Sequence, residues 1–288
     1  MFKITFGGKM DNNSTDDLNS PDSPSQAPGE IQDAELNHTD KIMGVFSEPS
    51  KTFETTAKFP IRTIDWILPV LLLALFVSFQ QILYHVNPNI SYELRQKQME
   101  ATEKFLNDQV KSGKITQEQA DQQKSMIEER MEKMAGVGLV FQIIGIFIVM
   151  FIVFFLMSLI YFLLAKFALK GEGTYSSVMV AYGLSWYISI LGIIVITIIS
   201  FLMGKLIMDT SVASFIGADK SSITGWLLAK LDVFSIWSFI VLGIGTAKMF
   251  KSASVQKYIA MVFGVWIIGG LILFFLAKAI PFLQFLNV

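Results

Sequence analysis

The sequence predicts an all-α, polytopic integral membrane protein with five transmembrane helices and a helical hairpin outside the membrane. Long uncharged apolar stretches alternate with charged ones, and the apolar stretches approach the ~20 residues that a membrane-spanning helix needs. Apolar residues make up 52% of the chain and the mean hydropathy is +0.52. A soluble domain averages about 45–50% apolar residues, so the segregation of the apolar stretches decides the class.

Composition excludes several classes of function. The net charge is −1, with 23 basic and 24 acidic residues and no basic stripe, so we expect no nucleic-acid partner. The absence of cysteine excludes disulfides, cysteine-ligated zinc and thiol nucleophiles. His38 and His85 are the only histidines and lie far apart in the sequence. We therefore expect neither a metal nor another cofactor, and no histidine-based catalytic triad.

Residues 1–40 are predicted to form a disordered polar tail. Between Asp11 and Asp40 the segment holds eight acidic residues and no lysine or arginine. Such a segment cannot bury enough apolar surface to offset the entropy lost on ordering. A tail that binds a partner is the alternative.

Residues 41–64 are predicted to form two short amphipathic helices at the membrane interface. Phe46 belongs to a short apolar face, and Pro49 suits the first turn of a second helix that carries Phe53. Lysines and an arginine surround these apolar residues, as is typical of interfacial helices. An ordinary linker is the alternative.

Residues 65–279 are predicted to form the membrane domain. Its first span, Trp66–Tyr84, has no charged residue, and Pro69 is expected in the first turn, where proline costs little. The next block, 87–134, is polar and is predicted to be an inserted helical hairpin outside the membrane. Ser112 and Gly113 break its helical pattern, and a capping box at Thr116 opens the second helix.

Four more apolar stretches complete the five predicted spans. They are Val137–Ala165, Val178–Met203, Val233–Ala247 and Tyr258–Ala277. The last two, joined by a short basic connection, form the pair around which we expect the chain to be organised. Residues 280–288 are predicted to be an interfacial C-terminal tail.

Asp232 stands at the entrance to the fourth span and needs a partner, water or an interfacial position there. One interpretation is that it caps or anchors the helix, against Lys230 or a basic group on a neighbouring span. The other is that it forms a proton or cation site.

The distribution of lysines predicts that the N-terminus lies in the cytoplasm. With that orientation, the short loops 166–177 and 248–257 are cytoplasmic and richer in lysine than 204–231 and 278–288.

Two motifs and a proline stand out along the chain: Phe46, Pro49 and Phe53, then Pro69, then Asp232, Phe234 and Trp237. With these residues the chain resembles the YIP-domain (Ypt/Rab-interacting protein) family, and it looks most like the bacterial members. The resemblance implies a five-helix membrane domain with a cytoplasmic N-terminus, here in the bacterial cytoplasmic (inner) membrane. Eukaryotic members resemble trafficking factors, but the Asp/Leu/Gly/Pro stretch associated with Rab partners is missing here.

The sequence allows three classes of function. The favoured hypothesis is a non-enzymatic integral membrane protein that acts through protein or lipid partners in membrane organisation or trafficking-like processes. Its expected partners are the lipid bilayer, unknown proteins and a second copy of the chain. The alternative is a small-solute or ion transporter or channel, based on the polar residues in the spans. A membrane enzyme would need a second catalytic group beside Asp232.

Overall fold

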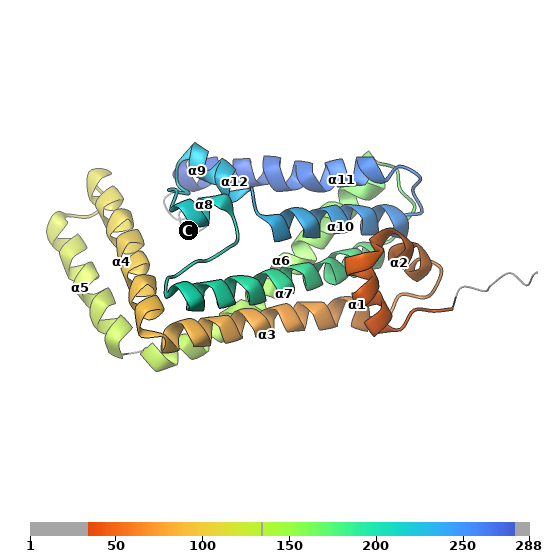
Figure 1. Cartoon of the computed structure of the whole chain (residues 1–288). Coiled ribbons are helices and arrows are strands. Elements are labelled where there is room, and N and C mark those ends of the chain that lie inside the picture. Colours follow the sequence, from red (N-terminus) through yellow and green to blue (C-terminus); the bar gives the residue numbers. More distant parts are fainter. Residues whose placement is uncertain (1–33, 134, 280–288) are drawn as a thin grey trace, which may run out of the picture. The chain divides into compact units, whose positions relative to one another are not determined.

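The computed structural model describes residues 34–133 and 135–279. The described residues from Glu35 to Ala279 belong to one compact unit. Its regular elements are helices (Figure 1). In the described ranges the only β-type pairing is an isolated antiparallel bridge between Ser211 and Asp232. Most of the tail predicted at 1–40, and the tail predicted at 280–288, lie outside the described residues.

Four helical stretches in the described ranges are long and apolar enough to cross a membrane. They are α3 (Ile64–Val86), α6 (Ala135–Leu163) with the π-helical η1 (Leu164–Ala168), α7 (Tyr175–Met203), and α11 (Val255–Gly264) with η2 (Val265–Gly269) and α12 (Gly270–Ala279). The remaining predicted span corresponds to α10 (Val233–Met249), an apolar helix of 17 residues. Helices rise 1.5 Å per residue, so α10 is about 26 Å long, slightly less than the ~30 Å hydrocarbon core.

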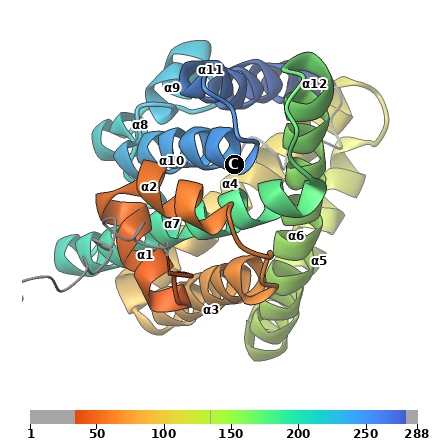
Figure 2. The ribbon, with the colours of Figure 1, turned by 90° about the vertical axis from the view of Figure 1, so that its right-hand side faces the viewer.

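Helix α7 lies at the centre of the unit, with α3, α6 and α10 packed against it (Figure 2). Every residue from Ser177 to Ile188 is buried. Two glycines allow this close packing. A Cβ at Gly183 would lie 2.6 Å from the Trp66 Cα, and one at Gly192 would lie 3.0 Å from Phe234. The last two spans were predicted to be the pair around which the chain is organised, but in the structure α7 is the helix enclosed by its neighbours.

Helix α6 has the opposite environment. Only 11% of the residues in its most apolar 18-residue stretch are buried, and large apolar side chains are exposed along its length. Among them are Val140, Ile144, Ile148, Ile152 and Leu156, each at least 50% exposed. A helix that exposes apolar residues at this density is suited to contact with lipid tails.

The polar block contains α4 (Pro88–Lys111) and α5 (Gln117–Lys133), which pack against each other. Lys124 and Glu103 pair between them. The capping box expected at Thr116 is present: Gln119 N donates to the Thr116 hydroxyl at 3.2 Å, and Thr116 N donates to Gln119 Oε1 at 2.9 Å. The two helices run across the direction of the long helices (Figure 1).

Four short helices complete the described unit: α1 (His38–Ser47), α2 (Pro49–Thr56), α8 (Val212–Ile216) and α9 (Ile223–Ala229). Helix α1 begins at His38, inside the segment expected to be disordered. Asn37 caps it by accepting a hydrogen bond from Asp40 N at 2.9 Å. Pro49 stands in the first turn of α2, as expected. Both helices pack against the bundle, α1 on α7 and α2 on α10.

Candidate functional site

A buried polar cluster fastens α1 to two of the long helices. Lys41 Nζ donates to Asp65 Oδ2 at 2.5 Å, and His38 Nδ1 donates to Asp65 Oδ1 at 2.9 Å. The other ring nitrogen of His38 lies 2.7 Å from the Tyr187 hydroxyl. Lys41 is 2% exposed and Asp65 is 1% exposed. These four residues, from α1, α3 and α7, are called the Asp65 cluster below.

The geometry of the Asp65 cluster explains how charges persist in a buried position. Removing a lysine and a carboxylate from water costs several kcal/mol per ion, and only close pairing with further hydrogen bonds offsets this cost. Asp65 receives one donor on each oxygen. It also lies in the first turn of α3, where the helix dipole favours a negative charge.

The sequence did not reveal this cluster, because the first span was predicted to begin at Trp66 and neither histidine had a predicted role. The available signal was the spacing of His38 and Lys41. Residues three apart share one face of a helix, so both side chains can reach the same acid. No pattern in the sequence identified Asp65 as that acid.

Pro69 is placed differently from the expectation. The span was expected to start at Trp66, but α3 begins at Ile64, so Pro69 is buried in the second turn. Proline has no backbone N–H, so Pro69 cannot donate to the carbonyl of Asp65 four residues earlier. A Cβ at Gly183 would lie 3.2 Å from that carbonyl oxygen, so α7 approaches α3 closely beside this interruption.

Three of the motif residues hold α1 and α2 on α10. The Phe46 and Trp237 rings meet edge to face, with centroids 5.6 Å apart. Phe53 is fully buried, and its ring would lie 2.8 Å from a Cβ at Gly245. The aromatic pair and the glycine contact therefore join residues that are almost 200 positions apart in the sequence. We call α1 and α2 together the helical cap.

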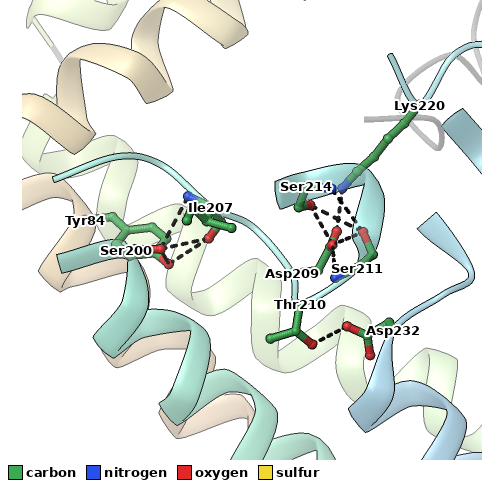
Figure 3. Close-up of polar contacts among 9 residues, drawn as sticks. All are labelled: Tyr84, Ser200, Ile207, Asp209, Thr210, Ser211, Ser214, Lys220 and Asp232. Atoms are coloured by element: carbon green, nitrogen blue, oxygen red, sulfur yellow. Dashed lines mark hydrogen bonds and ion pairs between the residues drawn. The ribbon is translucent and has the colours of Figure 1, made fainter. Parts of the chain in front are cut away.

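Asp232 caps α10 and connects it to the preceding segment. Its Oδ1 accepts from Ser235 N at 2.6 Å, and its Oδ2 accepts from the Thr210 hydroxyl (Figure 3). Lys230, the basic partner expected for Asp232, points elsewhere: its Nζ lies 4.9 Å from the centre of the Trp226 ring. Phe234 packs at Gly192 of α7.

The amino-acid sequence matches a known family. A family model for the Yip1 domain matches residues 43–277, which is most of the chain. The chain belongs to the Yip1 domain family. No curated protein and no solved structure gives a match. His38 and Lys41 lie just before the matched range, whereas Asp65 and Tyr187 lie within it.

A second acidic residue in this Yip1 domain lies beside Asp232. Asp209 accepts hydrogen bonds from the Ser211 hydroxyl at 2.5 Å and the Ser214 hydroxyl at 2.6 Å, and it pairs with Lys220 (Figure 3). Burial acts to raise the pKa of Asp209, but the hydrogen bonds and the lysine outweigh it and lower the pKa to about 2.

A cavity of about 170 Å³ lies between these two aspartates and α7. Both carboxylates that line it already have hydrogen-bond donors. In the described part of the chain, no group of three or more metal-ligating side chains occurs. Asp232 thus holds the 204–232 connection to the start of α10, whereas Asp209 joins residues within that connection.

Polar side chains inside the spans of the Yip1 domain connect neighbouring helices. Gln80 Nε2 of α3 donates to the Thr197 hydroxyl of α7 at 2.8 Å. Tyr84 and Ser200 both donate to the Ile207 carbonyl, at 3.1 and 3.0 Å (Figure 3). Hydrogen bonds of this kind stabilise helix pairs within a membrane. Gln80 and Thr197, two of the polar span residues on which the transport alternative was based, thus join α3 to α7.

Proposed function

We propose that the protein is a non-enzymatic integral membrane protein that acts through protein or lipid partners in membrane organisation or trafficking-like processes. The observation that carries this proposal is the use of the buried acids. Asp65 and Asp232 are both occupied by donors that join helices. A general acid or base needs access to a substrate proton, and these carboxylates are committed to other partners.

The α4–α5 pair is the surface proposed to meet a protein partner. It places long polar faces beyond the end of α3, and it exposes Tyr92 (64%) and Met126 (51%) among charged side chains. Exposed aromatic residues and methionine surrounded by polar residues are typical of protein interfaces. A shallow groove on α5 runs beside Met126, between Glu118 and Ser125.

The proposed topology has five crossings, with the N-terminus and the helical cap on the cytoplasmic side of a bacterial inner membrane. Its support is a contact between two loops. Gly171 and Gly173, in the α6–α7 loop, pack against Phe250 and Tyr258 at the α10–α11 connection. Helix α7 begins at the first of these loops and crosses the membrane, and α10 ends at the second. If both loops lie on one side of the membrane, α10 must therefore cross back, which makes it a fifth span. The lysines in both loops favour the cytoplasmic side.

Single cysteines at Ser112 and Ala253 should react with a membrane-impermeant maleimide from opposite sides of the membrane. The chain contains no other cysteine, so each product reports one position. Ser112 should react in cells with a permeable outer envelope, and Ala253 should react only after the inner membrane is opened. Equal reaction of both cysteines before opening would contradict the five-span topology.

A photocrosslinking residue at Met126 should form discrete adducts with a membrane-associated protein in native membranes. The matched control is Ile152, which is 59% exposed on the apolar surface of α6 and should give lipid adducts only. Mass spectrometry would identify the adducts, and reciprocal crosslinking from the identified protein would confirm the pair. The proposal fails if Met126 gives no protein adduct and the purified protein instead conducts solutes across liposomes.

A further inference from the structure

Lys230 is a half-buried cation enclosed by aromatic rings. Its Nζ lies 4.9 Å from the centre of the Trp226 ring and 5.3 Å from that of Trp266. No ion pair to a carboxylate is found for Lys230 among the described residues: Asp209 pairs with Lys220, and Asp232 accepts a hydrogen bond from Thr210. Burial lowers the pKa of Lys230. An anion beside its ammonium group would offset this cost of burying the charge.

A second lysine extends this feature toward the end of α12. Lys278 Nζ lies 4.4 Å from the centre of the Phe274 ring, and Phe274 lies 5.9 Å from Trp226. Two lysines and three aromatic rings from α9, η2 and α12 thus form one patch, which we call the lysine–aromatic patch. Tryptophan is enriched at headgroup level in membrane proteins, and lysine also serves there as an interfacial anchor.

Exposed aliphatic side chains adjoin the lysine–aromatic patch. Leu227 is 54% exposed, and it lies three residues before Lys230, so both share one face of α9. Leu231 and Val233, which follow Lys230, are 53% and 62% exposed. A free inorganic anion would use the lysines alone. A ligand with both a negative group and hydrocarbon chains would contact the lysines and these aliphatic side chains together.

We propose that the lysine–aromatic patch binds the phosphate of an anionic phospholipid, with Lys230 and Lys278 facing the phosphate and the exposed leucines contacting the acyl chains. The patch lies at the end of α12, opposite to the basic loop before α11, so the lipid belongs to the leaflet away from the helical cap. The proposal does not depend on the partner-mediated function proposed above.

The test measures binding of phosphatidylglycerol and phosphatidylcholine to the purified full-length protein in detergent by native mass spectrometry. The wild-type protein should retain phosphatidylglycerol preferentially. Lys230→Gln removes one charge and should weaken that binding about fivefold, as expected for one lysine near a headgroup. Lys257 is exposed at the opposite end of the span that carries Lys278. Lys257→Gln also removes one charge, but it should leave binding unchanged.

Further variants keep the outcomes distinct. Lys230→Arg retains the charge and should bind phosphatidylglycerol like the wild-type protein. Lys278 is exposed, so Lys278→Gln should weaken binding without disturbing the fold. Equal lipid binding by Lys230→Gln, Lys278→Gln and the wild-type protein would overturn the proposal. So would displacement of the lipid by millimolar inorganic phosphate with no effect of Leu227→Ser, since the site would then take a free anion. If photocrosslinking from Met126 gives no protein adduct but the lipid binds as expected, the result contradicts the proposed partner-mediated function and leaves the lipid proposal standing.

Discussion

Replacing Asp65 with leucine should lower the free energy of unfolding by about 3–5 kcal/mol, because Lys41 is then left buried without its carboxylate. The loss should appear first as release of α1, since the Asp65 cluster joins that helix to α3 and α7. Thermal unfolding in detergent measures the overall change. A cysteine at Val45, which is fully buried in α1, reports the release by its reaction with maleimide.

Two further variants test whether the loss of stability comes from breaking the Lys41–Asp65 ion pair or from replacing an acidic residue as such. Asp40→Asn changes an exposed acid on α1 and should cost less than about 1 kcal/mol. The double variant Lys41→Met/Asp65→Leu removes both charges and should recover most of the stability, since apolar pairs of similar volume can replace buried ion pairs. A double variant as unstable as Asp65→Leu would show that the charge pairing is not the cause of the loss.

Phe53→Ala should destabilise the protein by a similar amount, about 3–5 kcal/mol, through the cavity that the missing ring leaves. The ring is fully buried, and it fills the space that the absence of a side chain at Gly245 creates. Helix α2 should then separate from α10. Maleimide labelling of a cysteine at Thr56, which is 4% exposed, would detect this separation together with the lowered unfolding temperature.

Met43→Ala is the matched control for Phe53→Ala. Met43 is an apolar residue of the same helical cap, but it is 67% exposed, so its truncation should change stability by less than about 0.5 kcal/mol. Phe53→Leu keeps most of the apolar volume and should fall between the two. Equal effects of Phe53→Ala and Met43→Ala would show that the Phe53–Gly245 contact does not hold the cap.

The sequence by itself determined those features that depend on local patterns. Uninterrupted apolar stretches identified the long helices, because a membrane-spanning helix must satisfy its backbone internally and expose apolar side chains. Local cap chemistry identified Thr116 and Pro49, since each acts within one turn of its own helix. The motif around Asp232 and Trp237 was likewise readable, and the Yip1 family match agrees with it.

Only the tertiary structure decided how those helices combine. The hydrogen bond between His38 and Tyr187 joins residues 149 positions apart, and no periodicity in either segment specifies such a pairing. The central position of α7 also became apparent only once its neighbours surrounded it, because α6 is even more apolar yet is mostly exposed. In a membrane both lipid and protein neighbours are apolar, so hydropathy cannot distinguish a lipid-facing helix from a buried one. Glycine contacts and buried polar pairs make that distinction.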